Sequence, residues 1–402
     1  MESRKGSSLV DTKKRNHVLI KQEIFRRKPA MRTEIAEDLG LTLPTITTTV
    51  KAMIEEGLVE EYAVEDEKKV AAGRKPVAIR FRADAGYAAG IELGPYTITA
   101  VLMDLAGNIL GRAELPKASA YYQEMLDQIE EILLKVCEEA GVHQGNLLGV
   151  GIGLPGFIDS AYGVIRSNPR EDWTGRDLAG DFAQRCGLPV VIDNNVRLRT
   201  LGISLGSEEQ GSDSFAYLFV SRGVACPLVF GDESLTGASA GAGELGQTIL
   251  LTDAEDGRIE AKTVDELAGE LAIFMKCQEY LLAGQAPELQ KRLNEEGRIS
   301  TRMLLDLEKD GDPVVQGILT SASTYLGMAL ANVVNLINPG LVLVDGHLLA
   351  NEENRKVLEE TARGAFYGLN EEEVAIRFLP YDRYRGAEGA ALGAIKAFFI
   401  EK

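Results

Sequence analysis

Cysteine and histidine are scarce in this 402-residue chain. It holds four cysteines, far apart and without a Cys-x-x-Cys pair, and only 3 histidines. Disulfide frameworks and structural zinc knuckles both need several closely spaced ligands. The sequence therefore predicts no disulfide and no bound metal. The cysteines are expected to be small apolar or half-exposed side chains: Cys137, Cys186, Cys226 and Cys277.

Long hydrophobic runs are also lacking. No apolar stretch approaches the roughly 20 residues that a helix needs to cross a bilayer. The opening residues, MESRKGSSLVDTKKR, do not contain the apolar segment of a signal peptide. The sequence therefore predicts a cytoplasmic protein. A length of 402 residues, of which 45% are hydrophobic and 26% charged, fits two or three soluble globular domains.

Positive charge is deficient overall but not evenly distributed. The chain carries 43 basic and 61 acidic residues, a net charge of -18. Residues 1–82 hold 17 basic and 13 acidic residues, whereas residues 83–402 hold 26 and 48. A basic head on an acidic body fits a DNA-reading module joined to a part that does not bind DNA. The same imbalance also fits a merely solvated basic arm.

Two short helices with a tight turn between them are predicted in the head. The first covers residues 34–39, with Thr33 as its N-cap and Gly40 as the left-handed residue after its end. The second covers about residues 42–56 and follows an earlier helix over residues 16–28. Its buried stripe recurs at helical spacing: Ile46, Val50, Met53 and Ile54. This arrangement predicts a helix-turn-helix.

The second of these helices is expected to enter the major groove of DNA. Hydroxyl groups bond phosphates or base edges, and an ammonium group suits a phosphate. Two strands, over residues 58–62 and 73–81, then form a hairpin wing. The candidate DNA-binding residues of the helix and the wing are Thr45, Thr47, Thr48, Lys51, Arg32, Arg74 and Lys75. The alternative is a small helical element used only for packing.

From residue 87 the pattern changes to strands that alternate with helices. YAAGIEL, TITAVLMDL and ILGRAEL indicate three consecutive strands, and a helix follows over residues 122–140. The segment SFAYLFVS begins a second strand-rich set. Alternating strands and helices predict an α/β architecture. We expect two similar lobes with a cleft between them, the first over about residues 83–205 plus the C-terminal helix and the second over about 206–385.

Several segments, in order along the chain, resemble the ROK family of repressors, open-reading-frame products and sugar kinases. They are GIELGPYTITAVLMDLAGNIL, GVGIGLPGFID, PVVIDNNVR, GAGELGQ and ANVVNLINPGLVLVDG. The resemblance covers nearly the whole chain, including the winged helix of the family's regulator branch. It implies a winged helix-turn-helix over residues 1–82, followed over residues 83–402 by the two-lobed actin-like, ribonuclease H-like fold of the family's sugar kinases.

Three departures from the family's kinase pattern imply that phosphoryl transfer is lost. The first phosphate loop of the family is Asp-x-Gly-Gly-Thr; here Glu92 replaces the aspartate and Pro95 removes an N–H donor. The second loop lacks two glycines and contains Arg222. Asn195 stands where the family has its catalytic aspartate, and an amide has no useful basicity at neutral pH. The resemblance therefore implies a protein that is not an enzyme and needs no cofactor.

Polar residues remain at the positions that match the family's sugar-binding residues. The candidate ligand-binding residues are Asn168, Asn195, Glu244, Gln247 and Gly156. Gln247 also replaces the histidine that completes a zinc site in many members, and no cysteine follows it. For Asn168 and Glu244 the alternative role is loop capping. Trp173 could supply a stacking face for a sugar, although core packing is the favoured role.

These features predict a sequence-specific DNA-binding regulator, a repressor of carbohydrate-utilisation genes. We expect a homodimer or homotetramer on a palindromic operator, released when a sugar or sugar phosphate binds the cleft. Pentoses, hexoses, amino sugars and sugar phosphates all stay open as effectors. Two alternatives are a bifunctional ATP-dependent sugar kinase with a DNA-binding head, and a regulator controlled by a protein partner with a vestigial cleft.

Overall fold

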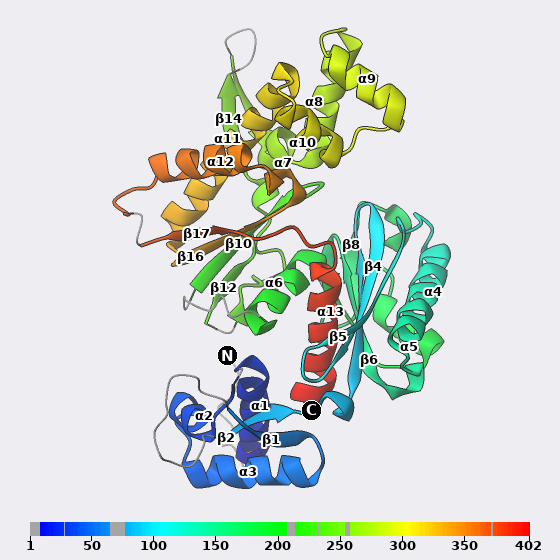
Figure 1. Ribbon diagram of the computed structural model, residues 1–402, viewed down its shortest axis with the longest axis vertical. Coiled ribbons are helices and arrows are strands. Elements are labelled where there is room, and N and C mark those ends of the chain that lie inside the picture. The colour runs from blue at the N-terminus through cyan, green and yellow to red at the C-terminus, as the bar shows by residue number, and fades with distance from the viewer. Residues whose placement is uncertain are drawn as a thin grey trace. The chain divides into compact units, whose positions relative to one another are not determined.

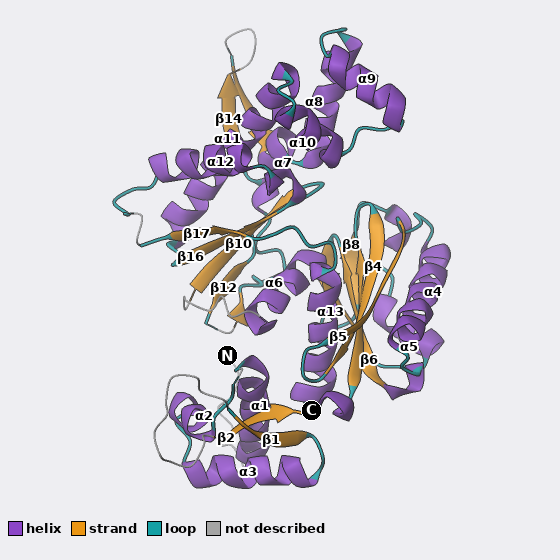
Figure 2. Ribbon diagram, viewed as in Figure 1, coloured by secondary structure: helices purple, strands orange, loops and turns teal. Residues whose placement is uncertain are grey.

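The computed structural model describes residues 9–27, 29–64, 77–206, 214–231, 233–253, 258–370 and 373–402. The chain forms two compact units (Figures 1 and 2). The first comprises Met1–Glu209 together with Arg383–Lys402, and the second comprises Gln210–Asp382. Each unit contains a sheet with helices packed on it, so the predicted α/β class is confirmed.

Three helices and an antiparallel hairpin make up the N-terminal part of the first unit: α1 (Leu9–Arg26), α2 (Arg32–Leu39), α3 (Leu43–Glu55), β1 (Val59–Ala63) and β2 (Val77–Phe81). This is the predicted order of elements. The turn between α2 and α3 depends on Gly40, whose φ of 59° is left-handed. Thr33 is not the N-cap of α2 as predicted. Met31 takes that place without a side-chain bond, so α2 begins at Arg32.

The helix α1 begins at Leu9, earlier than the predicted residue 16, because no proline or glycine interrupts residues 9–15. It buries Ile20, Ile24 and Phe25. The tip of the predicted wing, including Arg74 and Lys75, lies outside the described residues.

A five-stranded sheet in the order β5-β4-β3-β6-β9 forms the body of the first unit. Its strands are β3 (Tyr87–Leu93), β4 (Thr97–Asp104), β5 (Ile109–Pro116), β6 (Leu147–Leu154) and β9 (Val190–Asn194). Its helices are α4 (Tyr122–Ala140), α5 (Leu178–Cys186), α6 (Asn195–Gly206) and α13 (Arg385–Ile395), and short elements are η1 (Ala83–Ala85), η2 (Gln144–Asn146), β7 (Phe157–Asp159), β8 (Val164–Ser167), η3 (Glu171–Trp173) and η6 (Lys396–Ile400). Both faces of the sheet are covered, α4 and α5 lying on one and α13 on the other (Figure 2).

The C-terminal helix α13 lies directly on the sheet backbone. A Cβ atom at Gly90 would lie 2.0 Å from the Ala387 carbonyl oxygen, and one at Gly151 would lie 1.9 Å from the Ala390 oxygen. No other residue type fits at these two strand positions without moving the helix. The position of α13 is therefore fixed closely by β3 and β6.

The second unit is built on the sheet β13-β12-β10-β16-β17, with β11 paired to β10. Its strands are β10 (Ser214–Val220), β11 (Val224–Ala225), β12 (Leu228–Phe230), β13 (Glu233–Ser234), β16 (Leu341–Asp345) and β17 (Ala375–Phe378), with a separate hairpin of β14 (Ile249–Asp253) and β15 (Ile259–Thr263). Its helices are η4 (Leu245–Gln247), α7 (Val264–Ala268), α8 (Glu270–Leu282), α9 (Pro287–Glu296), α10 (Thr301–Lys309), α11 (Pro313–Ile337), η5 (His347–Ala350) and α12 (Glu352–Gly364).

The helix α11 is long and apolar enough to cross a membrane by length and composition alone. Yet 56% of its most apolar window is buried inside the protein, where Leu319, Leu326 and Leu330 belong to the core of the second unit. A buried core helix meets the same criteria of length and hydropathy. The burial of α11 is that of a core helix.

Glu308 provides a pH-dependent contribution to the stability of the second unit. Its carboxylate is buried and accepts hydrogen bonds from Asn351 and, at 3.1 Å, from Asn354. Burial raises the pKa of Glu308 despite these two bonds. Folding therefore disfavours the anion, and stability is lost as the pH rises from the unfolded pKa through the raised folded pKa.

We expect the variant Glu308→Gln to gain stability relative to the wild type as the pH rises from about 4 to about 8, because an amide does not ionise. Melting temperatures across this range measure the effect. The variant Glu288→Gln, at an exposed position of α9, is the control and should show no such trend. A constant difference between Glu308→Gln and the wild type would contradict this expectation.

Candidate functional site

The predicted recognition helix α3 presents its candidate DNA-binding residues on one side. Thr47, Thr48 and Lys51 are exposed and Thr45 is half-buried, while Ile46, Val50 and Met53 face the core. The Thr48 hydroxyl donates to the Pro44 carbonyl oxygen at 2.8 Å, so towards a DNA base it can act only as an acceptor. Lys51 Nζ lies 3.7 Å from Glu55 Oε1, and an exposed ion pair at this distance contributes little to stability. Its ammonium group is therefore available to a phosphate.

Arg32, another predicted DNA-binding residue, has a structural partner. Its guanidinium donates to the Glu61 carboxylate at 2.5 Å and so ties the start of α2 to the strand β1. The side chain is only 19% exposed. The contact to Glu61 holds the wing against the helix-turn-helix.

In the first unit, three polar side chains meet beyond the carboxyl ends of β3 and β9. Asn195 begins α6, directly after β9, and its Nδ2 donates to Glu92 Oε1 at 3.1 Å. Arg199, one helical turn later, donates to both carboxylate oxygens of Glu92, at 3.0 and 2.7 Å. All three side chains are buried. The two arginine bonds form a bidentate ion pair with the carboxylate.

This ion pair determines what the cluster can do chemically. A buried carboxylate that already accepts three hydrogen bonds, two of them from a cation, is not free to hold a divalent metal. Asn195 supplies no base. Arg199 was not predicted as a site residue; its only sequence signal is a basic residue one turn after Asn195 on the same helix face.

The β7–β8 hairpin, which Gly156 precedes and Asn168 follows, is brought against the same strand ends. Gly156 has a φ of 106°, and a Cβ atom there would lie 2.3 Å from the Ser167 carbonyl oxygen. Its own carbonyl oxygen accepts from Asn194 Nδ2 at 3.0 Å. The structure therefore places Gly156 beside Asn168 at this edge of the sheet, next to the residue that precedes Asn195.

Asn168 serves to shape this loop. Its Nδ2 donates to the Pro155 carbonyl oxygen at 2.7 Å, and its Oδ1 accepts from the Arg170 N–H at 2.8 Å. The side chain is buried. Loop capping, the alternative role of Asn168, accounts for both of these bonds.

Trp173 is a core residue and not an accessible platform for a sugar. It is fully buried in the cluster formed by the sheet, α4 and α5. The Arg170 guanidinium lies 4.2 Å from the centre of its ring. The structure therefore agrees with the favoured role, core packing.

The second unit contains Glu244 and Gln247, both exposed. Gln247 Nε2 donates to Asp265 Oδ2 at 2.9 Å, and the other oxygen of Asp265 accepts from the Val224 N–H at 2.7 Å. Burial raises the pKa of Asp265, against the effect of these bonds. Asp265 was not predicted; it joins the Gln247 segment to the loop that follows β10, the segment predicted as the second phosphate loop.

No cluster of three or more metal-ligating side chains occurs among the residues that the structure describes. The four cysteines are unpaired, and three of them are buried. Burial raises the pKa of the Cys226 and Cys277 thiols to about 12, so neither is a thiolate at neutral pH.

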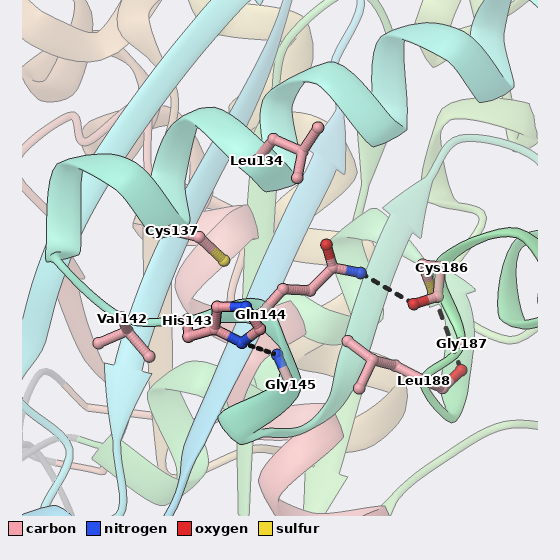
Figure 3. A pocket seen from close by; sticks show the side chains of 9 residues that line it. All are labelled: Leu134, Cys137, Val142, His143, Gln144, Gly145, Cys186, Gly187 and Leu188. Atoms are coloured by element: carbon pink, nitrogen blue, oxygen red, sulfur yellow. Dashed lines mark hydrogen bonds between the residues drawn. The ribbon is translucent and has the colours of Figure 1, made fainter.

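An open cavity of about 460 Å³ lies in the first unit, where the ends of α4 and α5 meet η2 (Figure 3). It is lined by Leu134, Cys137, Val142, His143, Gln144, Gly145, Cys186, Gly187 and Leu188. Gln144 Nε2 donates to the Cys186 carbonyl oxygen at 2.8 Å, and His143 Nδ1 accepts from the Gly145 N–H at 3.1 Å. These two bonds hold the loops, and none of the predicted site residues lines this cavity.

Comparison with known proteins places these features in a family. The model of the ROK family matches residues 88–397. A xylose repressor from Bacillus subtilis (strain 168) is 24% identical over 341 residues, which are 84% of this chain and 83% of that protein. The crystal structure of a ROK family transcriptional regulator, a homologue of the E. coli MLC protein, covers 97% of both chains with a TM-score of 0.77 and 21% identity. A ROK hexokinase from Thermus thermophilus covers 76% of this chain and 97% of its own, with a TM-score of 0.59 and 26% identity.

Proposed function

Since this chain belongs to the ROK family, we propose that it is a DNA-binding transcriptional repressor of carbohydrate-utilisation genes. The observation that carries the proposal is the helix α3, which presents Thr47, Thr48 and Lys51 outward from a helix-turn-helix. Residues 1–82 would read DNA, and residues 83–402 would sense the effector. The matched ROK regulator structure covers 97% of the chain, whereas the matched hexokinase covers 76%.

We propose a sugar as the effector, with D-xylose as the first candidate because of the name of the matched relative. Asn195, Gly156 and Asn168 lie at one edge of the first unit's sheet. Glu244 and Gln247, in the second unit, are kept as candidate ligand contacts. Thr45, Arg32, Arg74 and Lys75 are kept as candidate DNA contacts. A homodimer or homotetramer in the cytoplasm, on a palindromic operator, is part of the same proposal.

The expected result of a gel-shift titration at fixed salt is tight binding to DNA fragments recovered by genome-wide footprinting. One member of a panel of pentoses, hexoses, amino sugars and sugar phosphates should weaken this binding at least about tenfold, within the usual range of allosteric coupling. Specific DNA binding that no sugar alters would contradict the sensor role and favour control by a protein partner.

The alternative of a bifunctional kinase is tested by a coupled ATPase assay with the same panel. We expect no turnover above the blank for the wild type, because Glu92 is held by Arg199 and Asn195 is not a base. The variant Asn195→Asp restores the base but not a free Glu92 carboxylate, so it should also be inactive. Turnover by the wild type would overturn this part of the proposal.

A further inference from the structure

The orientation of the Asn195 amide is fixed by its neighbour. A carboxylate only accepts hydrogen bonds, so Asn195 must turn its Nδ2 towards Glu92. Arg199 holds that carboxylate in place through both oxygens. Among the described residues Asn195 makes no other side-chain hydrogen bond, which leaves its carbonyl oxygen and the second hydrogen of Nδ2 to meet a ligand. A ligand that bonds to this oxygen must donate a proton, as a sugar hydroxyl does.

The same ion pair lies against the C-terminal helix. A Cβ atom at Gly386, in the first turn of α13, would lie 2.1 Å from the Glu92 carboxyl carbon. Further along, a Cβ atom at Gly389 would lie 1.9 Å from the Leu198 carbonyl oxygen of α6. The helices α6 and α13 and the Glu92 carboxylate are in direct contact, with no side chain between them. A shift of Asn195 and α6 is therefore expected to move α13 as well.

The C-terminal end of this segment, η6, contacts the DNA-binding part. In η6 the Phe399 ring packs edge-on against Phe81 of β2, with 5.0 Å between ring centres. Lys21 of α1 donates to the Phe399 carbonyl oxygen at 2.8 Å, and its ammonium lies 4.6 Å from the centre of the same ring. Figure 1 shows the C-terminus beside the winged helix. Phe399 and Phe81 belong to one hydrophobic core with Ile20 of α1.

We propose that the Glu92–Arg199 ion pair is a positioning element, which presents the Asn195 carbonyl oxygen to a ligand hydroxyl and ties that contact to the winged helix through α13 and Phe399. This proposal rests on the proposed function. The ligand is a polyhydroxyl compound, and its binding needs no metal ion because Arg199 supplies the positive charge beside Glu92. The effector changes the position of the DNA-binding part only to the extent that its affinity differs between the conformation that binds DNA and the conformation that does not.

The contact between Phe399 and the winged helix is tested with two variants of adjacent residues. Phe399→Ala removes the contact to Phe81, whereas Phe398→Ala, the matched control, alters a side chain that packs over Gly149 of β6. The measured quantity is the ratio of the DNA dissociation constants with and without D-xylose, or another panel sugar that binds, on a duplex selected from random sequence by the full-length protein. Calorimetry gives the sugar affinity separately.

Phe399→Ala should bring this ratio to within about twofold of one while the sugar affinity stays within about threefold of the wild type, because the ring contact to Phe81 is removed and the ligand site is unchanged. Phe398→Ala should keep the wild-type ratio. A wild-type ratio in Phe399→Ala, or equal losses in both variants, would overturn the link. If the wild type binds the duplex with the same dissociation constant in the presence and absence of every sugar, the sensor part of the proposed function fails, and the link fails with it.

The positioning role of Glu92 is tested with two double variants. Glu92→Gln/Arg199→Met keeps an acceptor oxygen for Asn195 Nδ2, whereas Glu92→Met/Arg199→Met removes it; neither leaves a lone buried charge. The first should keep the sugar affinity within about threefold of the wild type, and the second should lose about tenfold, the value of one hydrogen bond. Equal affinities in the two double variants would contradict the positioning role.

Discussion

The double variant Thr47→Asp/Lys51→Glu is expected to lose operator binding by at least about a hundredfold at fixed salt. It removes one cation and adds two carboxylates on the exposed side of α3, so the net charge there falls by three. Phosphate contacts dominate affinity for DNA, and a contact to a base edge adds about 1–3 kcal/mol. Both residues are more than one-third exposed, so the fold should be unaffected.

Fluorescence anisotropy with a labelled duplex, alongside circular dichroism, measures this effect. The control is Lys291→Glu/Asn294→Asp, which makes the same change in charge at exposed positions of α9. It should bind DNA within about threefold of the wild type, because α9 is not among the elements proposed to contact DNA and only the net charge changes. If the control weakens binding as much as the α3 variant, net charge and not α3 governs DNA affinity.

The variant Arg199→Ala is expected to destabilise the first unit by about 3–5 kcal/mol. It leaves the Glu92 carboxylate, which is 3% exposed, buried without its cation. Glu92→Gln/Arg199→Met should recover most of this loss, because replacing both members of a buried ion pair by neutral groups of similar size is often close to neutral.

Urea unfolding followed by hydrogen exchange of the β3 and α6 amides measures the loss in the unit where it arises. The control is Arg112→Ala, whose exposed pair with Glu388 at 3.2 Å should contribute less than about 1 kcal/mol. A loss of less than about 1 kcal/mol in Arg199→Ala would show that water or a shifted side chain takes over the role of the guanidinium.

Local patterns predicted most helices and strands of the winged helix and the first unit, but not the start of α1 or the N-cap of α2. The spacing of Ile46, Val50, Met53 and Ile54 predicts the buried side of α3; the first three are buried and Ile54 is half-buried. The helix predicted over residues 122–140 is α4 with the same bounds. These features depend on residues within a few turns of one another, whose periodicity a sequence displays directly.

The sequence by itself determined the family and the helix-turn-helix, and it places an amide at Asn195. Only the tertiary structure decided what surrounds that residue. Glu92 lies 103 residues from Asn195 along the chain and 107 from Arg199, and the three meet because the parallel strands β3, β6 and β9 end at one edge of the sheet. No local periodicity encodes a contact over that separation; it arises when the strands take their order and the helices close over them.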